Sequence, residues 1–348
     1  MRGVDGVRRL GHIGLMEAPS DLQLRADAGD PVAQVTLART LLGSGESRQD
    51  QFFEAIALVD SASASGHGDA TALAALFAGM GVARPQSWPL AFDLLQLAAE
   101  QGSRSAQQQL VFLANPDVDP QVAVATGGAR VWAETRAAIS LDRLLHHPER
   151  RALCSAPRIR IIEGFASAAE CRWLIDRART MLKAALIFDV HGRHVADPGR
   201  SNKGTDFQLG DMDVVIEIIR ARIAAATRIP VPVFEPTQVL HYTAGQEFKR
   251  HIDALEPTNP HHREQLRTHG QRIATVLIYL NQAFKGGETE FSAVGLRYRG
   301  NTGDALFWPN VDGEGTPDPL TLHAGLPPTS GEKWLLSQWI RDRPPPSR

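Results

Sequence analysis

Residues 242–253 read YTAGQEFKRHID, and the pattern at the end of this stretch is the strongest guide to the chain. The run EFKRHID predicts a strand, on which positions i and i+2 face the same side. His251 and Asp253 would then point an imidazole and a carboxylate at one place. A further histidine, His323, lies 70 residues later in LTLHAG, on another predicted strand. These three residues are candidate metal ligands.

Two histidines and one carboxylate on one face of a metal leave its other positions open, which is the arrangement of non-haem Fe(II) oxygenase sites. Open positions are needed when a chelating cosubstrate and O2 must both reach the ion. The alternative is a chance His-x-Asp pair, since the chain contains 12 histidines.

A lysine follows ten residues after His323, in the run SGEKWLLSQW. Lys333 would lie just inside a strand, where burying its charge is costly unless an anion pairs with it. The C5 carboxylate of 2-oxoglutarate would be such a partner, through a charge-assisted hydrogen bond. The alternative is a solvated lysine where the strand begins.

The second half of the chain predicts an α+β fold. RIRIIEGF (158–165) predicts a strand, and 167–182 predicts a helix with Ser167 and Glu170 as a capping box. Residues 213–227 predict an amphipathic helix. Seven strands are then expected, in PTQVLHYT, EFKRHID, RIATVLIYLN, GETEFS, DALFWPN, LTLHAG and KWLLSQWIRD. Short strands with covering helices indicate a double-stranded β-helix, or jelly roll.

From Tyr242 to Trp339 the chain resembles the catalytic core of the prolyl 4-hydroxylases. The resemblance rests on Y-x-x-G-Q-x-F-x-x-H-x-D, R-x-A-T-V-L-I-Y-L-N and G-G-E-T-x-F, followed by G-D-A-L-F-W, L-H-A-G-L-P and G-x-K-W-L-L-S-Q-W. A weaker likeness extends back to Ile159. The resemblance to the prolyl 4-hydroxylases implies an enzyme that uses Fe(II), 2-oxoglutarate and O2, with ascorbate as reductant.

The resemblance also implies a role for each matched residue. Those that match the iron ligands are His251, Asp253 and His323. Those that match the 2-oxoglutarate pocket are Lys333, Tyr242, Thr289 and Trp339. Tyr242 and Thr289 have an ordinary alternative as strand residues, because both types favour sheets.

Candidate substrate residues lie where the chain departs from the family or where a mobile cover is expected. Phe248 replaces a frequent tyrosine three positions before His251, and Arg341 follows Trp339 by two. Arg200 and Ser201 match the start of a mobile segment that often covers the peptide substrate in this family, and the lack of apolar periodicity in GRSNKGTD (199–206) is consistent with a flexible lid. His261 and His262 are expected in a polar loop after Pro260.

The first third of the chain predicts helices, since residues 20–113 are rich in Ala, Leu and Gln. Gly29, Gly66 and Gly102 recur at spacings of 37 and 36, and each precedes an alanine by four residues (Ala33, Ala70 and Ala106). A glycine suits the left-handed end of a helix, and a small alanine allows the next helix to pack closely. This region resembles tetratricopeptide-like repeats of the Sel type; the alternative is a helical cap with accidental spacing.

The expected organisation is a tail (1–19), an α-helical repeat domain (20–113), a bridging segment (114–156), the dioxygenase domain (157–343) and a short tail (344–348). Hydrophobic residues make up 43% and charged residues 22%, as in globular proteins. The net charge of −2 gives no pull toward nucleic acid or a membrane surface. The two cysteines match no zinc or redox motif, and the sequence contains neither a signal peptide nor a membrane-spanning segment. We therefore expect a cytoplasmic protein.

The leading interpretation is a dioxygenase that hydroxylates a peptidyl residue, with proline favoured, on a protein selected by the repeats. One alternative is a hydroxylase of a free amino acid or small metabolite. Another is a non-catalytic interaction protein whose barrel is a relic. A metal-dependent cupin that catalyses another reaction, such as an isomerisation, would not need Lys333. A halogenase would need halide in place of the Asp253 carboxylate.

Overall fold

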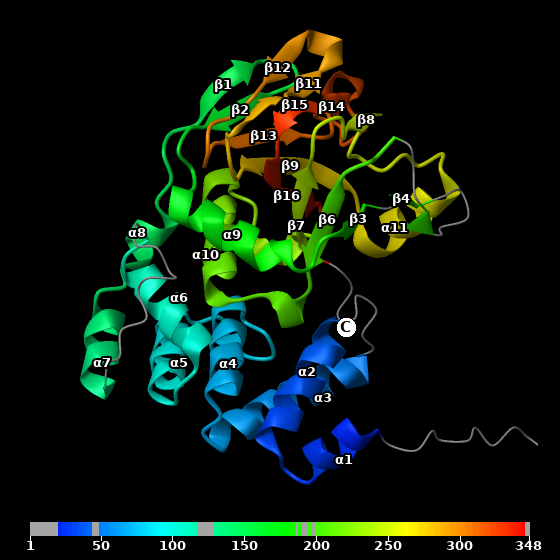
Figure 1. Cartoon of the computed structure of the whole chain (residues 1–348). Helices are drawn as coiled ribbons and strands as arrows, with labels where there is room; N and C mark the ends of the chain where they lie inside the picture. Colours follow the sequence, from blue (N-terminus) through cyan, green and yellow to red (C-terminus); the bar gives the residue numbers. More distant parts are fainter. Residues whose placement is uncertain are drawn as a thin grey trace, which may run out of the picture.

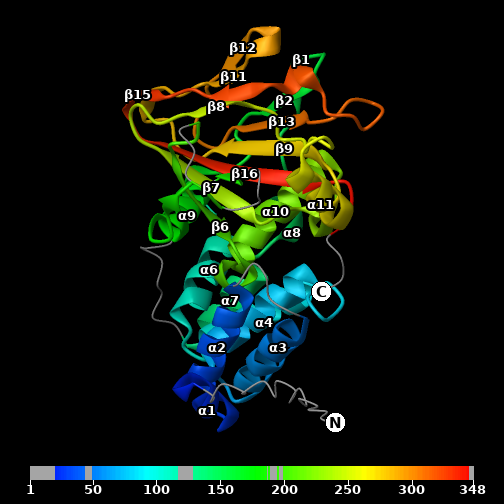
Figure 2. The same ribbon diagram turned by 90° about the vertical axis from the view of Figure 1, so that its right-hand side faces the viewer.

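The structure is a computed structural model that describes residues 20–43, 49–116, 128–185, 187–188, 194–195 and 199–344. The expected tail 1–19, and 345–348 of the expected C-terminal tail, lie outside these residues. The described chain has a helical part at one end and a β-sheet part at the other, with α9 and α10 between them (Figures 1 and 2).

The helical part begins with three successive helix pairs. They are α1 (Asp21–Asp27) with α2 (Pro31–Gly43), α3 (Gln49–Ala64) with α4 (Gly68–Met80), and α5 (Trp88–Glu100) with α6 (Arg104–Ala114). Gly29, Gly66 and Gly102 lie between the two helices of a pair, with φ of 86°, 82° and 88°. The alanine four residues after each glycine is buried. The expectation of left-handed glycines and close alanine packing is therefore confirmed.

The chain between the helix pairs and the sheets is also structured where it is described. Helix α7 (Ala129–Ala137) lies beside α5 and α6, and α8 (Leu141–Leu145) lies against α10 (Val214–Thr227). Strand β1 (Arg151–Cys154) pairs with β2 (Ile159–Ile162). This stretch thus contributes both to the helical part and to the sheet.

The β-sheet part contains antiparallel strands in two main sheets. The eight-stranded main sheet has the order β1, β2, β13 (Ala305–Pro309), β9 (Arg272–Tyr279), β16 (Lys333–Arg341), β7 (Thr237–Tyr242), β6 (Lys203–Phe207), β3 (Lys183–Ala184). The four-stranded sheet has the order β12 (Leu296–Tyr298), β11 (Thr289–Phe291), β14 (His323–Gly325), β8 (Phe248–His251). Two short pairs are β10 (Phe284–Gly286) with β15 (Pro328–Gly331), and β4 (Ile187–Phe188) with β5 (His194–Val195).

Both faces of the central strands of the main sheet (β13, β9, β16 and β7) are buried, and alternation along each strand decides which core a side chain joins. On β9, Leu277 and Tyr279 belong to a core that also contains Phe291 of the small sheet. Their neighbours Val276 and Ile278 belong to a larger core that continues into the helices. Figure 2 shows the two sheets as layers, with the helical part beyond the main sheet. The main sheet is therefore the central layer.

Helices α9 (Ala168–Arg179) and α10 cover the helical side of the main sheet. The expected capping box is confirmed, because Ser167 and Glu170 exchange hydrogen bonds at the start of α9. Glu170 also pairs with Arg222 of α10 through contacts of 2.6 and 2.9 Å. The Arg222 Nε donates to the Leu144 carbonyl of α8 at 2.6 Å. One buried ion pair thus joins three helices.

Three local expectations are wrong. Lys203–Phe207, placed in a flexible lid, forms β6 and pairs with β7 in the main sheet. His261 and His262, expected in a polar loop, belong to helix α11 (Pro260–His269). Asp253 was expected on the same strand as His251, but β8 ends at His251 and Asp253 lies in the turn that follows. Pairing and packing with distant segments outweigh local propensity in these places.

Within the described ranges, no helix is long and apolar enough to cross a membrane.

We predict that Arg222→Ala destabilises the protein by about 3–5 kcal/mol, because it leaves the buried Glu170 carboxylate without its partner. The matched control is Arg130→Ala, which removes the exposed Arg130–Glu134 pair of α7 and should change stability by less than about 0.5 kcal/mol. Urea unfolding followed by tryptophan fluorescence measures both. Equal losses in the two variants would contradict the role given to the pair.

Candidate active site

A pocket lies between the two sheets, and we call it the intersheet pocket. Its polar lining comes from Tyr242, His251, Asp253, Thr289, His323 and Lys333, and its apolar lining includes Leu240, Leu277, Trp308 and Leu335. Of the ten site residues expected from the sequence, nine line this pocket; the exception is Arg341. The fold therefore gathers residues that span more than 130 positions of the chain.

His251, Asp253 and His323 form a compact cluster, with one ligand atom of each lying within 4.8 Å of the others. Antiparallel pairing of β8 with β14 places His323 directly opposite His251. The Nε2 atoms of His251 and His323 lie 3.5 and 3.6 Å from the two carboxylate oxygens of Asp253. The cluster is the only group of this kind found among the described residues.

Backbone carbonyls orient both imidazole rings. The Nδ1 of His251 lies 2.7 Å from the Lys249 carbonyl, and the Nδ1 of His323 lies 2.9 Å from the Thr321 carbonyl. An Nδ1–H donated to a carbonyl leaves Nε2 as the free lone pair, which is the form that binds metals. Both Nε2 atoms face Asp253, so the donor set suits a divalent ion with imidazole and carboxylate ligands.

Asp253 is buried and held by groups from the main sheet. The Thr275 hydroxyl donates to its carboxylate at 2.6 Å, and the Asn310 amide donates to that hydroxyl at 2.9 Å. Burial by itself would raise the pKa of Asp253, but His323, His251 and the Thr275 hydrogen bond lower it below its ordinary value. The carboxylate is therefore ionised and fixed in place at neutral pH.

His323 is kept neutral in the same cluster. Burial, reinforced by the nearby His251, lowers the pKa of His323 to about 4, although Asp253 opposes this shift. A neutral imidazole is the state that a metal ion requires.

Lys333 is the least satisfied group of the pocket. Its side chain is 0% exposed, and its Nζ has no hydrogen-bond partner among the described residues. Nζ lies 5.1 Å from the centre of the Tyr242 ring, because Lys333 and Tyr242 are directly paired on β16 and β7. Burial lowers the pKa of Lys333 to about 7. A buried ammonium without a partner fits an anionic ligand in this pocket.

Tyr279 completes the wall around Thr289, and the sequence did not single it out. Its hydroxyl lies 2.8 Å from the Thr289 hydroxyl and donates to the Tyr298 carbonyl at 3.0 Å. Thr275, Leu277 and Tyr279 are every second residue of β9 and share one face. The alternation of side chains along the strand RIATVLIY could therefore have identified Thr275 and Tyr279 from the sequence. Asn310 had no such signal, because it acts only through Thr275.

Phe248 and Arg200 form a stack at the histidine side of the pocket. The Phe248 ring lies on the His251 ring with centroids 3.6 Å apart, and the Arg200 guanidinium lies 4.6 Å from the Phe248 centroid. An isolated β-bridge between Arg200 and Phe248 fixes this arrangement. Hydrophobic and cationic surface therefore meets beside His251.

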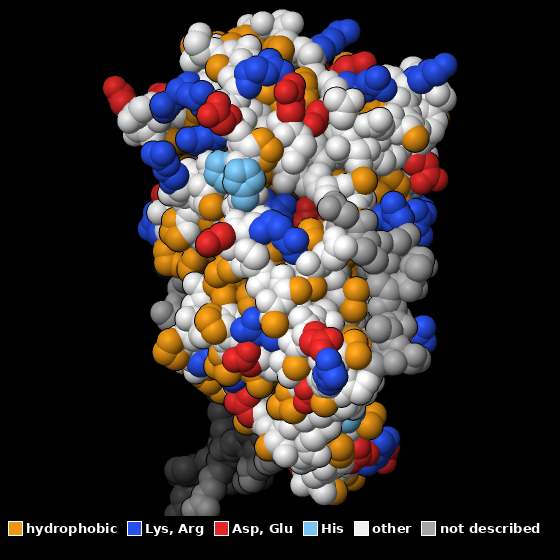
Figure 3. All heavy atoms as spheres, turned by 90° about the vertical axis from the view of Figure 1, so that its left-hand side faces the viewer, with side chains coloured by type: hydrophobic (Ala, Val, Ile, Leu, Met, Phe, Trp, Pro, Cys, Tyr) orange, Lys and Arg blue, Asp and Glu red, His pale blue; other side chains and the backbone are white. Residues whose placement is uncertain are grey.

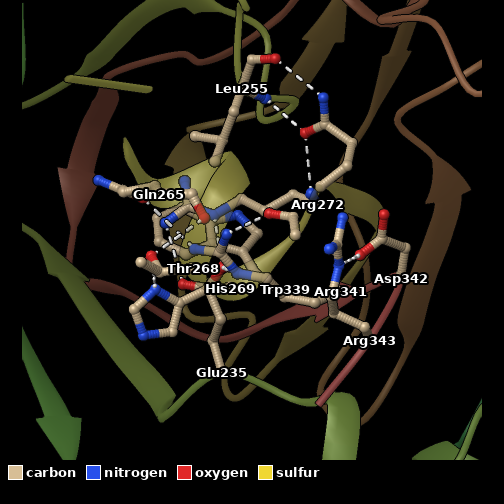
Figure 4. A network of polar contacts seen from close by, with 12 residues as sticks. Glu235, Leu255, Gln265, Thr268, His269, Arg272, Trp339, Arg341, Asp342 and Arg343 are labelled. Carbon is tan, nitrogen blue, oxygen red and sulfur yellow. Dashed lines mark hydrogen bonds and ion pairs between the residues drawn. The ribbon is translucent and has the colours of Figure 1, made fainter. Parts of the chain in front are cut away.

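Arg341 lies outside the pocket, in the polar network of Figure 4. Its Nε pairs with Glu235 at 2.7 Å, and its Nη1 donates to the Gly270 carbonyl at 2.6 Å. Glu235 also binds Arg272, whose guanidinium stacks 3.6 Å from the centre of the Trp339 ring. Arg341 thus supports Trp339, which does line the pocket, and is not itself exposed to a ligand there.

The same network holds the turn that follows Asp253. The side-chain amide of Gln271 accepts from the Leu255 N–H at 2.7 Å and donates to the Leu255 carbonyl at 2.8 Å. Gln271 lies between α11 and β9, so this two-point contact fixes the turn to the main sheet. The position of the Asp253 carboxylate therefore also depends on Gln271, which does not line the intersheet pocket.

Comparison with known proteins agrees with this geometry. A family model described as the 2OG-Fe(II) oxygenase superfamily matches residues 237–341. Probable prolyl 4-hydroxylase 9 of Arabidopsis thaliana is 31% identical over 205 residues, which cover 54% of this chain and 69% of the relative. Probable prolyl 4-hydroxylase 4 of the same plant is 30% identical over 225 residues, covering 58% and 74%.

A solved structure is also similar. The viral collagen prolyl hydroxylase vCPH from Paramecium Bursaria Chlorella virus-1, in its 2OG complex, is 29% identical and covers 54% of this chain and 98% of its own, with a TM-score of 0.42. On the curated relatives, the chain belongs to the prolyl 4-hydroxylase-like 2OG-Fe(II) oxygenases. It is accordingly a 2-oxoglutarate-dependent dioxygenase, and the family implies Fe(II), 2-oxoglutarate and O2.

The buried Lys333 makes a prediction about stability and pH in the absence of 2-oxoglutarate. Its pKa of about 7 in the folded protein is below the ordinary 10.5, so the unfolded chain binds more protons between these values. The free energy of unfolding should therefore rise by several kcal/mol as the pH increases from 7 to 10.5. Below pH 7 the destabilisation caused by burying Lys333 should be fully present. Lys333→Met should remove this rise.

The matched control is the exposed Lys285→Met, which should keep the wild-type pH profile. Urea unfolding at several pH values measures all three proteins. If the stability of the wild type and of Lys333→Met changed with pH in the same way, the pKa of Lys333 would not be lowered by burial.

Proposed function

We propose that His251, Asp253 and His323 hold Fe(II), and that Lys333 binds the C5 carboxylate of 2-oxoglutarate. The observation that carries the proposal is the unpartnered Lys333 ammonium, buried in the same pocket as the His–Asp–His cluster. A buried cation is strongly disfavoured unless an anion joins it, and a carboxylate would make a charge-assisted hydrogen bond. Tyr242 and Thr289 complete the cosubstrate pocket in this proposal, with Trp339 at its wall.

Iron and 2-oxoglutarate, when bound, supply the oxidising chemistry that uses O2 to convert a C–H bond to C–OH, with succinate and CO2 as coproducts. The chain contributes position and exclusion of water. The two carbonyl-bound imidazoles and the Thr275-bound carboxylate are arranged before any ligand arrives. Phe291 and Trp308 pack against His323 and keep bulk water from the cluster. Ascorbate is proposed as the external reductant that maintains iron in the ferrous state.

A peptidyl residue, with proline favoured, is the proposed substrate. Two considerations support it: the relatives that show the family carry the name prolyl 4-hydroxylase, and the Phe248–Arg200 stack gives the pocket a hydrophobic and cationic mouth beside His251. Phe248 and Arg200 are the proposed substrate contacts. Arg341 would act on the substrate side only indirectly, by supporting Trp339 through Glu235 and Arg272.

The helix pairs are proposed to be tetratricopeptide-like repeats that select the protein substrate, next to a jelly-roll catalytic domain. Left-handed glycines at a spacing of 36–37 residues support the repeat assignment, because one helix–turn–helix unit has this length. Stacked repeats commonly present concave surfaces to protein partners. A cytoplasmic setting is proposed as well, supported by the two free cysteines, Cys154 and Cys171.

Cofactor binding is tested by anaerobic addition of Fe(II) and 2-oxoglutarate, with the weak visible charge-transfer band as readout. We predict a band in the wild type, its loss in His251→Ala, and a 2-oxoglutarate requirement raised about 100-fold in Lys333→Ala, since a charged hydrogen bond contributes about 1.5–3 kcal/mol. The exposed Lys285→Ala is the matched control and should keep the wild-type band. A metal-loaded protein that gives no band would refute the proposed site.

The substrate is tested with a library of proline-containing peptides and with free amino acids, using mass spectrometry to detect added oxygen. We predict hydroxylation of peptidyl proline and a loss of activity toward peptides in Arg200→Ala, with uncoupled 2-oxoglutarate turnover retained. Oxidation of free amino acids alone would favour a small-metabolite hydroxylase. A protein that binds the cofactors but turns over neither class would favour the interaction-protein alternative.

A further inference from the structure

A second cavity, with a volume of about 670 Å³, lies where α10 ends against the main sheet, and we call it the arginine pocket. Four arginines line it: Arg150, Arg158, Arg160 and Arg228. One acidic residue, Glu149, also lines it, and none of these residues lines the intersheet pocket. Figure 3 shows the face that carries α8, β1 and β2, where several Lys and Arg side chains lie around exposed histidine, with Asp and Glu side chains among them.

The four guanidinium groups have no acidic partner within the part of the chain that the structure describes. Nearby arginines do have one: Arg151 pairs with Glu163 at 2.7 Å, and Arg222 pairs with Glu170 at 2.6 Å. With His147 neutral, the lining of the arginine pocket carries a net charge of +3, although the whole chain carries −2. Positive charge is thus concentrated in one hollow of a slightly acidic protein.

Ordered elements hold the walls of the arginine pocket. Arg160 of β2 is paired directly with Phe307 of β13, and Phe307 and Pro309 supply an apolar surface between the arginines. On the opposite side, the segment with His147 and Arg150 follows α8, which is tied to α10 by the Arg222–Leu144 hydrogen bond. Arg160 lies on β2 and Arg228 directly follows α10, so these two elements set the backbone positions of two of the four arginines.

Arg228 occupies a position where the backbone favours glycine. It follows the last residue of α10 with φ of 63°, a left-handed conformation that an L side chain rarely adopts. Its side chain lines the arginine pocket. An arginine at this position is unfavourable for the backbone but adds a fourth positive charge to the pocket.

We propose that the arginine pocket binds a phosphate group, either as free pyrophosphate or as the phosphate of a small organic ester such as a nucleotide. Guanidinium forks match the geometry of phosphate oxygens in bidentate hydrogen bonds, and they remain charged at all physiological pH values. The volume is that of a site for one small ligand. The apolar surface of Phe307 and Pro309 would contact the organic part of an ester.

An extended polyanion is a poorer match than a small ligand. The positive charge is confined to one hollow, and the net charge of the chain is negative, so a long nucleic acid backbone would meet repulsion outside it. The site is independent of the proposed catalytic function, since the residues of the two pockets do not overlap.

The test is calorimetric titration of the full chain, without iron, with ADP, pyrophosphate and adenosine at low ionic strength. We expect ADP, pyrophosphate or both to bind and adenosine not to bind. Binding of pyrophosphate alone identifies free phosphate as the source, and binding of ADP alone identifies an ester. Failure of both to bind overturns the proposal.

Variants decide whether binding occurs in this pocket. Arg160→Gln and Arg228→Gly should each weaken binding about tenfold, because each removes a charged hydrogen-bond donor. Arg228→Gly should also keep or raise the melting temperature, since glycine suits its backbone conformation. The control Arg267→Gln, on the exposed face of α11, should bind like the wild type.

A further control separates the two anion-binding pockets. Lys333→Met should bind ADP or pyrophosphate as the wild type does, and saturating 2-oxoglutarate should not compete. Competition by 2-oxoglutarate, or loss of binding in Lys333→Met, would place the ligand in the intersheet pocket and overturn the proposal. Equal affinity in the wild type, Arg160→Gln and Arg228→Gly would show diffuse surface attraction and would also overturn it.

Discussion

The register of β16 between β7 and β9 is the constraint on which the rest of the structure depends. It places Lys333 beside Tyr242 and directs the alternate residues of three strands into the layer between the sheets. A slip by one residue would send Lys333 into the helix-facing core and Trp334 into the pocket. The register is well specified because β16 and its neighbours β7 and β9 are buried on both faces, so that a shifted strand would not satisfy its neighbours.

Polar groups in the layer between the sheets are tolerated because most are partnered within it. Thr275 joins Asp253 to Asn310, and Tyr279 joins Thr289 to the Tyr298 backbone. Lys333 is different, because its charge is buried and its ammonium has no hydrogen-bond partner among the described residues. In the proposed function, the ligand carboxylate would compensate for this cost, which ties the energetics of the fold to the proposed chemistry.

The helical part is joined to the oxygenase part by a continuous hydrophobic core and by specific polar contacts. Gln109 of α6 accepts a hydrogen bond from the Val214 N–H at the start of α10, and Arg39 of α2 donates to the Gly210 carbonyl. Contacts of this kind fix the position of the helices relative to the main sheet. A partner held by the helices would therefore have a defined position relative to the intersheet pocket.

The sequence by itself determined the features that depend on local pattern. Strand alternation, the Ser167–Glu170 capping box and the recurring left-handed glycines follow from residue type and spacing. The order of the motifs selected seven residues that line one pocket, and the wider family resemblance added Phe248 and Arg200. Only the tertiary structure decided that Lys203–Phe207 joins the main sheet, that the Thr275 hydroxyl holds Asp253 just beyond β8, and that Arg341 lies outside the pocket. Each of these depends on contacts between residues far apart in the chain, and such contacts leave no periodic signal in the sequence. The arginine pocket is of the same kind, because its residues come from four separate segments that the fold alone brings together.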